Sequence, residues 1–193
     1  MKIQLDDFLF VGAGKTRKVY SHPSDFKKCI KIEAHNVLNP VTLKRRKKAA
    51  IRERRYLSRY ARKQCDFTQL ARFWGDVDTN LGPGEIYDLV RDDDGNVAQS
   101  LGHYLREGMA FEEVKSLLDD LQAYMITNGI IPTDLHVGNV VVQKLDSGNK
   151  LVIVDGIGNP EFLKLADYVK ALSTSKIKRR IKRLRNKILR RYF

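Results

Sequence analysis

Cysteine, proline and long apolar runs are all scarce in this chain. Its 193 residues include two cysteines and five prolines. Cys29 and Cys65 lack the close spacing of a metal-binding or redox pair, so neither a disulfide framework nor a zinc site is expected. No segment approaches the roughly 18 apolar residues of a membrane-spanning helix. The start of the chain, with Asp6 and Asp7, does not resemble a secretory signal. We therefore expect a cytoplasmic protein.

Acidic residues are scarce mainly at one end of the chain. The net charge is +13, from 36 basic and 23 acidic residues. The stretch 176–191 holds ten basic residues and no acidic one, which leaves 26 basic and 23 acidic residues elsewhere. The excess charge is therefore local, and any anionic partner is expected at this tail rather than over the whole surface.

The remaining residues predict a globular α+β protein, because 42% of the chain is hydrophobic and the apolar positions are periodic. Strands and one inserted helix are expected in the first half, and mainly helices, together with a hairpin, in the second. The expected strands are 3–11, 18–20, 29–32, 73–77, 85–90, 140–142 and 151–154. The expected helices are 41–62, 100–106, 111–128 and a basic amphipathic helix over 176–193. This order indicates two lobes, about 1–88 and about 95–175, within a single domain.

The strongest functional pattern lies in the second half. Asp134 is followed after four residues by Asn139, and a predicted hairpin then leads to Asp155-Gly156. Phosphoryl transfer needs a carboxylate that orients the attacking hydroxyl and accepts its proton, and oxygen ligands for Mg²⁺. A tight hairpin would bring Asn139 and Asp155 to neighbouring backbone ends. The alternative is a chance Asp and Asn in surface turns.

This pattern resembles the protein-kinase-like superfamily. The Asp-Leu-His-x-Gly-Asn form, residues 134–139, is most similar to its aminoglycoside-phosphotransferase-like and lipopolysaccharide-sugar-kinase branches. The length and motif layout over residues 3 to about 170 look most like the YrbL family of small bacterial kinase-like proteins. The resemblance implies a two-lobed protein-kinase-like fold, with an N-terminal antiparallel sheet and one helix, and a reduced, mostly helical C-lobe.

The resemblance also implies roles for individual residues, and ATP and Mg²⁺ as cofactors. Asp134 would be the catalytic carboxylate, and Asn139 and Asp155 would hold the metal. His136 would orient Asp134 or the loop backbone, or else be a solvated loop histidine.

Lys31, between Ile30 and Ile32 in a predicted strand, would bind the α- and β-phosphates, unless it is an edge-strand lysine that points to solvent. Glu53 is the only acidic residue among eleven bases in 44–63, which makes it the candidate ion-pair partner of Lys31. It could equally be a local helix partner of neighbouring bases.

The segment 11–20 looks like a kinase glycine-rich loop, in which bare backbone approaches phosphates. The resemblance implies nucleotide contacts from this loop and from a hinge near residues 87–91. The implied nucleotide-binding residues are Gly12, Ala13, Gly14, Lys15, Thr16, Val19, Lys31, Asp88 and Leu89. Arg17 stands where the family's third glycine is expected, and a plain hairpin turn is the alternative interpretation.

A Walker A motif is a rival interpretation, because Gly14-Lys15-Thr16 matches its end. The full motif needs a glycine at position 9, where this chain has Leu9, and a helix directly after the threonine. The residues after Thr16 instead predict a strand and a turn.

Two departures from the kinase pattern bear on the substrate. Pro132-Thr133 replaces the usual His-Arg before the catalytic aspartate, and only 38 residues follow Asp155. A full activation segment, which holds peptide substrates in protein kinases, cannot fit. We therefore expect the acceptor to be the hydroxyl of a small molecule, of a sugar or of a lipopolysaccharide-type saccharide. The alternative function is a non-catalytic kinase-like regulator that binds nucleotide or partner proteins.

The basic tail carries an apolar stripe at helical spacing, formed by Ile177, Ile181, Leu184 and Ile188. Such a helix could pack its stripe on the protein body or lie on an anionic membrane leaflet, on the inner face of the membrane. Nucleic acid is the least favoured partner, because nothing in the sequence predicts base readout.

Overall fold

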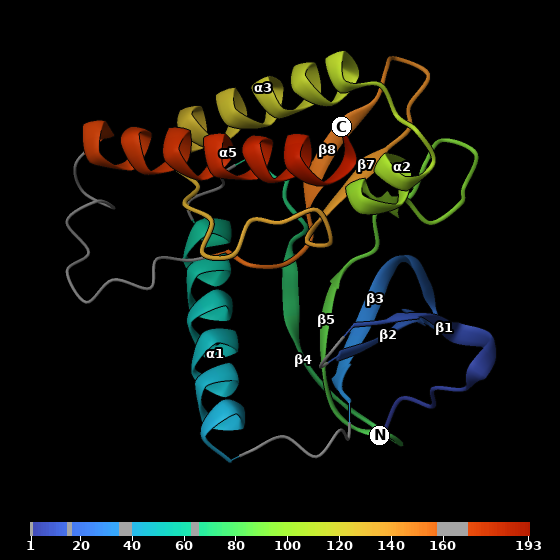
Figure 1. Ribbon diagram of the computed structural model, residues 1–193. Coiled ribbons are helices and arrows are strands. Elements are labelled where there is room, and N and C mark those ends of the chain that lie inside the picture. Colours follow the sequence, from blue (N-terminus) through green and yellow to red (C-terminus); the bar gives the residue numbers. More distant parts are fainter. Residues whose placement is uncertain (1, 15–16, 35–39, 63–65, 158–169) are drawn as a thin grey trace.

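The computed structural model describes residues 2–14, 17–34, 40–62, 66–157 and 170–193 (Figure 1). Its first part is a five-stranded antiparallel sheet with the order β1-β2-β3-β5-β4. The strands are β1 (Phe10–Ala13), β2 (Arg17–His22), β3 (Asp25–Glu33), β4 (Phe73–Thr79) and β5 (Gly82–Asp88). Helix α1 (Pro40–Arg62) is inserted between β3 and β4 and stands beside β4 in Figure 1.

The outer face of this sheet has a small core of its own. Tyr20, Ile30 and Ile32 are buried there together with Leu5 from the N-terminal segment. The strand predicted over 3–11 is wrong for most of its length. Residues Asp7–Leu9 form a 3-10 helix in which the Asp6 carboxylate accepts from the Leu9 N–H (3.1 Å), and the ladder begins only at Phe10. A carboxylate that caps a turn competes with strand pairing at this point.

The inner face of the sheet carries charge. Val19 lies opposite Lys31, and Lys31 lies opposite Glu85, across adjacent antiparallel strands. Directly opposed residues project to the same side of a sheet, so these three side chains share the inner face. Lys31 is only 8% exposed, which excludes a solvent-facing edge lysine and places an ammonium group within the fold.

The second part combines helices with a small antiparallel sheet of order β6-β7-β8. Its elements are β6 (Gln99–Ser100), α2 (Leu101–Arg106), α3 (Phe111–Asn128), β7 (Val140–Gln143), β8 (Lys150–Ile153) and α5 (Lys170–Tyr192). Ser100 caps α2 by accepting from the His103 N–H (3.2 Å), and Gly129, with φ of 64°, ends α3 in the left-handed conformation. These boundaries match the sequence predictions for both helices.

Helices α3 and α5 lie side by side across the top of Figure 1. The predicted stripe of α3 is buried, and the four stripe residues of α5 are at most 2% exposed. Burial of one such aliphatic side chain contributes about 1.5–3 kcal/mol. The stripe of α5 therefore belongs to the protein core, and only the basic face of this helix is left for contact with an anionic surface. The helix begins at Lys170, six residues before the predicted start.

Backbone contacts join the two parts of the molecule at β8, the second strand of the β7–β8 hairpin. Leu70 pairs with Ile153 in a parallel bridge, and the Ala71 N–H donates to the Ile153 carbonyl (2.9 Å). Leu70 and Ile153 are both buried in the main core. Across the described residues, no helix has the length and apolar character needed to cross a membrane.

Candidate active site

The β7–β8 hairpin places Asn139 and Asp155 at the same end of the small sheet. Val140 lies opposite Ile153, and the Val154 N–H donates to the Asn139 carbonyl (3.0 Å). Asn139 directly precedes β7, and Asp155 is the second residue after β8. The hairpin thus fixes the distance between two residues that are sixteen positions apart in the sequence.

Gly156 brings the loop of Asp134 against this end of the hairpin. Its φ is +82°, and a Cβ at this position would lie 2.4 Å from the Asp134 carbonyl oxygen and 2.9 Å from Asn139 Nδ2. Only glycine permits this approach, because any side chain would displace backbone. Asp134, Asn139 and the Asp155-Gly156 turn are therefore in mutual contact.

Backbone hydrogen bonds hold the peptide that precedes the Asp134 side chain. The N–H groups of Thr133 and Asp134 both donate to the Gly156 carbonyl (2.8 and 3.1 Å), and Asn139 Nδ2 donates to the Asp134 carbonyl (2.9 Å). The Asp134 carboxylate itself is 74% exposed. A fixed backbone thus presents a carboxylate that is open to an incoming molecule.

His136 contacts both of the groups that the sequence suggested for it. Its Nδ1 accepts from the Gly138 N–H (3.0 Å), and its Nε2 lies 3.8 Å from Asp134 Oδ2. A neutral imidazole whose Nδ1 accepts carries its proton on Nε2. The N–H of His136 therefore faces the Asp134 carboxylate.

Oxygen atoms suited to Mg²⁺ remain at this site. Asn139 donates through Nδ2, so its Oδ1 can act as an acceptor. The Asp155 carboxylate accepts from the Gly156 N–H (2.8 Å) through Oδ1 and still has further lone pairs for a cation. Within the described ranges, no three His, Cys, Asp or Glu side chains gather as a metal cluster. Mg²⁺ needs fewer protein ligands than such a cluster provides, because it is usually held by one or two side chains together with phosphate oxygens and water.

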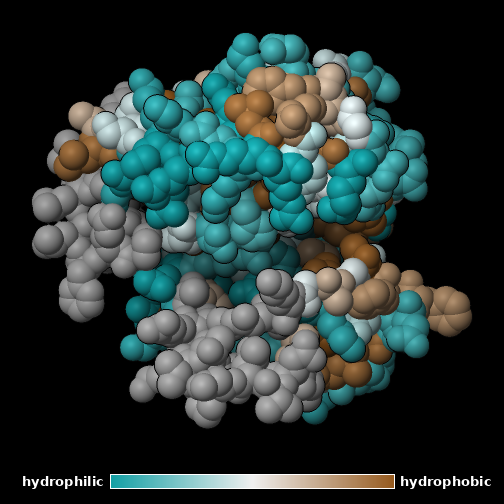
Figure 2. Space-filling view, viewed as in Figure 1, coloured by the Kyte–Doolittle hydropathy of each residue, from teal (hydrophilic) through white to brown (hydrophobic). Residues whose placement is uncertain are grey.

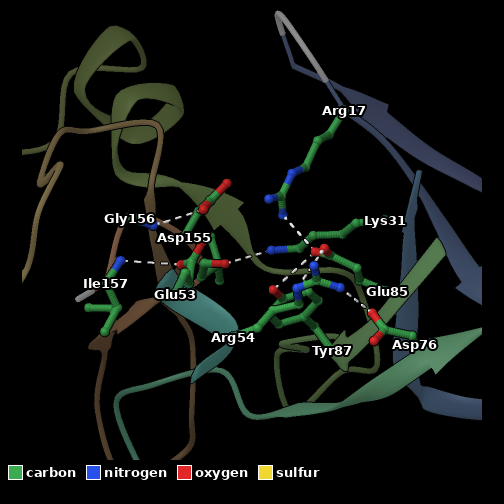
Figure 3. Close-up of polar contacts among 11 residues, drawn as sticks. Arg17, Lys31, Glu53, Arg54, Asp76, Glu85, Tyr87, Asp155, Gly156 and Ile157 are labelled. Atoms are coloured by element: carbon green, nitrogen blue, oxygen red, sulfur yellow. Dashed lines mark hydrogen bonds and ion pairs between the residues drawn. The ribbon is translucent and has the colours of Figure 1, made fainter. Parts of the chain in front are cut away.

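Lys31 reaches across from the sheet to this turn. Its Nζ donates to the Val154 carbonyl (2.6 Å), next to Asp155, and lies 4.1 Å from the centre of the Tyr87 ring. Figure 3 shows Lys31 pointing from β3 toward Asp155. The ammonium group thus connects the two parts of the molecule directly beside the expected metal ligand.

Glu53 from α1 reaches the same turn from the other side. It is 6% exposed, and its Oε1 accepts from the Ile157 N–H (3.2 Å). No ion pair joins Glu53 to Lys31 among the described residues, so the predicted direct pairing is not formed in this structure. Lys31 binds the Val154 carbonyl instead, and the Glu53 carboxyl interacts with the neighbouring Asp155 carboxylate.

The two carboxyl groups of this pair have different pKa values. Burial and the neighbouring Asp155 charge raise the pKa of Glu53 to about 7. Burial alone would raise the pKa of Asp155, but Lys31 and Arg17 outweigh it and hold that pKa below its ordinary value. Asp155 is therefore the ionised member of the pair and the better cation ligand.

Neither packing nor backbone conformation in this structure requires glycine at positions 12 and 14 of the glycine-rich segment. A Cβ at Gly12 would meet no described atom within 4 Å, one at Gly14 would meet only the Arg17 carbonyl at 3.8 Å, and neither residue has a left-handed φ. Such a cradle suits close approach by phosphate oxygens. Ala13 lies at the end of β1, whereas Lys15 and Thr16 fall outside the described residues. A strand, β2, follows this segment instead of the helix that a Walker A motif needs.

The backbone N–H groups of the expected hinge residues Asp88 and Leu89 already donate hydrogen bonds within the protein. The Asp88 N–H donates to the Arg72 carbonyl (3.0 Å), and the Leu89 N–H donates to the Lys27 carbonyl (2.8 Å). The Asp88 carboxylate accepts from Trp74 Nε1 (2.6 Å). A nucleotide base would therefore have to meet other backbone groups of this segment. Val19, on the inner face of β2, packs against the main core.

Two arginines near the site were not predicted from the sequence. Arg180 of α5 donates from Nη1 to the Thr133 carbonyl (2.8 Å), one residue before Asp134. It lies three residues after Ile177 and four before Leu184, on the flank of the buried stripe, and this is the one signal that could have separated it from the other bases of the tail.

The second is Arg17 of β2, whose Nη1 lies 3.2 Å from Glu85 Oε2. It lines a cavity of about 650 Å³ between α1 and the sheet, together with Lys31 and Arg54. Figure 2 shows the molecule hollowed between its two parts.

Comparison with known proteins identifies the family. The family described as PhoP regulatory network protein YrbL matches residues 3–189, and the chain belongs to it. The uncharacterized YrbL proteins of Escherichia coli (strain K12) and of Shigella flexneri are each 29% identical to this chain over 172 residues, which covers 87% of this chain and 79% of theirs.

The fold was also compared with solved structures. Rad53 1-466 in complex with AMP-PNP matches 96% of this chain and 52% of its own, with a TM-score of 0.57 and 15% identity. The kinase domain of Mycobacterium tuberculosis PknI matches 76% of this chain and 56% of its own, with a TM-score of 0.49 and 13% identity. The chain therefore spans about half the length of these kinases. The likeness to Rad53 confirms the predicted α+β kinase-like fold.

Proposed function

We propose that this member of the YrbL family is a phosphotransferase that moves the γ-phosphate of ATP to a hydroxyl group. The observation that carries the proposal is the contact of Asp134, Asn139 and the Asp155-Gly156 turn around one glycine that tolerates no side chain. The kinase-like fold, shared with a Rad53 structure that was solved in complex with AMP-PNP, supports a nucleotide site.

ATP with Mg²⁺ supplies the phosphoryl group and the divalent charge that stabilises it during transfer. The residues of this chain would orient and polarise the reactants around it. Asn139 Oδ1 and the ionised Asp155 are the groups suited to hold the cation, and Lys31, with its ammonium beside Val154, is suited to bind phosphate oxygens. The bare backbone at Gly12 and Gly14 would let the loop approach the phosphates closely.

Asp134 is the group suited to receive the proton of the attacking hydroxyl. Its carboxylate is exposed, and its backbone is fixed through both the Thr133 and the Asp134 N–H groups. The Nε2 of His136 lies 3.8 Å from this carboxylate and is suited to help orient it toward the acceptor. General-base catalysis of this kind contributes about 10²- to 10⁴-fold to the rate.

The chain length favours a small acceptor. Only twelve residues, 158–169, separate Ile157 from α5, and α5 is packed in the core through its apolar stripe. A long segment that could hold a peptide has no place in this layout. We therefore propose a small-molecule or saccharide hydroxyl as the acceptor, and a sugar of the cell envelope as the first class to examine.

A screen of envelope saccharides with ATP radiolabelled at the γ-phosphate tests the proposal. We expect label transfer to at least one saccharide, and Asp134→Asn should lower it by at least about 100-fold while ATP binding is retained. Asp120→Asn is the matched control, because Asp120 is an exposed aspartate on α3 and is not one of the proposed site residues. ATP binding without transfer to any acceptor would support a non-catalytic, nucleotide-binding regulator instead. Equal transfer by Asp134→Asn would disprove the role of Asp134.

A further inference from the structure

Arg17 occupies the position where a kinase glycine-rich loop has its third glycine. It lies opposite Glu33, in the same register that sets Val19 opposite Lys31, so its side chain shares the inner face of the sheet with Lys31. Figure 3 shows the guanidinium between Glu85 and the Asp155-Gly156 turn, in the space that Lys31 also enters. The loop thus replaces its smallest residue with a long cation directed into the candidate site.

The bonding of Arg17 is incomplete. The guanidinium interacts with the Glu85 carboxylate and the Tyr87 hydroxyl. Its Nη1, 3.2 Å from Glu85 Oε2, is nevertheless buried and makes no hydrogen bond of good geometry among the described residues. Buried guanidinium nitrogens normally have partners, because an unpaired polar group away from water costs free energy. A donor in this state has capacity left for a ligand.

Glu85 does not depend on Arg17 for its own partners. Its Oε1 lies 3.4 Å from Arg54 Nε, and its Oε2 accepts from the Tyr87 hydroxyl (3.2 Å). Arg54 also pairs with Asp76 and so ties α1 to the edge of the sheet without Arg17. A purely structural explanation of Arg17 as the counter-charge of Glu85 therefore leaves its presence in this loop unexplained.

The charge of Arg17 also acts on the expected metal ligand. Burial would lower the pKa of Arg17, but the charges of Asp155 and Glu85 raise it above its ordinary value. The guanidinium therefore lies within electrostatic reach of the place where phosphates and Mg²⁺ would meet.

From this geometry we infer that Arg17 is a second phosphate-binding cation of the nucleotide site, working beside Lys31. The inference rests on the proposed nucleotide site. A guanidinium presents a planar fork of donors that matches phosphate oxygens, whereas the Lys31 ammonium acts as a point charge. The ligand class that needs both cations is a nucleoside di- or triphosphate rather than a monophosphate.

Calorimetric titration with ATP, ADP and AMP, each with Mg²⁺, tests the role of Arg17. We expect Arg17→Gly, which supplies the glycine of the usual loop, to weaken ATP and ADP binding by about 10- to 100-fold and to leave AMP binding within twofold. Arg17→Gln, which keeps most of the side-chain size, should give the same pattern. Lys18→Gly is the matched control, because Lys18 is the exposed neighbour on the opposite face of β2, and its nucleotide affinities should not change.

The outcomes separate this inference from the proposed function. If the unaltered protein binds none of the three nucleotides, both fail. If it binds ATP and both Arg17 variants bind ATP equally well, only the role of Arg17 is overturned. Equal weakening of ATP and AMP binding would also overturn it, because that pattern indicates a structural role for Arg17 in the sheet. Unfolding of each variant without nucleotide, measured in urea, identifies any loss of fold.

Discussion

Helices α1 and α5 each bring one side chain to the same pair of backbone segments. Both helices have 23 residues. Pro132 and Ile157 form an antiparallel bridge, and Glu53 of α1 binds the Ile157 N–H while Arg180 of α5 binds the Thr133 carbonyl. The backbone of the candidate site is therefore held from two sides, by Glu53 from α1 and by Arg180 from α5.

The two helices are anchored differently. Helix α5 buries four aliphatic side chains against the core. Helix α1 buries Leu57 and Tyr60 there near its C-terminal end, whereas its part around Arg54 contacts the sheet through ion pairs and borders a cavity of about 650 Å³. Apolar burial does not depend on a ligand, whereas ion pairs and a cavity beside the proposed phosphate site would be altered by a bound ligand. We therefore expect α5 to be a fixed support and the part of α1 around Arg54 to respond to nucleotide.

The largest expected effect is on the anchor of α5. Ile181→Ala removes a side chain that is 1% exposed and should lower the free energy of unfolding by about 2–5 kcal/mol, because a cavity is left in the core. Urea denaturation measures the change, and Arg183→Ala, at an exposed position of the same helix, should be nearly neutral. A loss below about 1 kcal/mol for Ile181→Ala would mean that α5 is not held by its stripe.

The close contact between Gly156 and the Asp134 loop, which both helices support, can be tested by substitution of Gly156. Gly156→Ala should lower the free energy of unfolding by about 1–3 kcal/mol more than Gly95→Ala, because overpacking against backbone is added to the backbone strain. The two glycines have nearly equal φ, +82° and +84°, but a Cβ at Gly95 would meet nothing within 4 Å among the described residues. Chemical denaturation of both variants isolates the clash. Equal losses would show that the contact with Asp134 is not tight.

Arg180 should affect catalysis rather than nucleotide binding. Arg180→Ala frees the Thr133 carbonyl and is expected to lower kcat by about 10- to 100-fold with little change in KM for ATP, because misplacement of the Asp134 loop weakens orientation of the acceptor. Arg180→Lys should restore part of the rate. Steady-state kinetics with the acceptor found in the screen measures both, with Arg179→Ala as the exposed neighbour. An unchanged kcat would show that the contact between Arg180 of α5 and Thr133 does not contribute to catalysis.

The smallest effect is expected at Glu53. Glu53→Ala leaves the Ile157 N–H without its acceptor and should cost about 1–2 kcal/mol of stability, whereas Glu53→Gln keeps a side-chain oxygen at this place and should cost less. Thermal or urea unfolding compares the two, with Arg55→Ala as the exposed control on α1. If both Glu53 variants unfold like the control, α1 does not hold the turn.

Much of the fold and the centre of the candidate site follow from local sequence patterns. The stripe of α3 and the turn at Gly129 have regular spacing, and the Asp134–Asn139 motif lies one hairpin away from Asp155, so each could be predicted from neighbouring residues. Glu53 is conspicuous because it is one acid among eleven bases. Each of these features could be recognised because its residue type or spacing stands out from the neighbouring sequence.

The features that local patterns do not predict depend on contacts between distant elements. Arg180 is one of ten bases in the tail, and its contact with Thr133 arises only when α5 packs on α3. Arg17 looks only like a lost glycine in the sequence, because its inward direction follows from the register of β2 with β3. The segment before Phe10 alternates in apolar residues as a strand does, while the cap from Asp6 turns the chain instead.

Calorimetry of ATP binding with and without Mg²⁺, on the unaltered protein and on Asp155→Asn and Asp134→Asn, tests whether Asp155 holds the metal of a bound nucleotide. We expect Mg²⁺ to strengthen ATP binding to the unaltered protein and to Asp134→Asn, and we expect Asp155→Asn to lose this dependence on Mg²⁺. Binding of ATP by Asp155→Asn with undiminished Mg²⁺ dependence, or no binding by the unaltered protein, would contradict it.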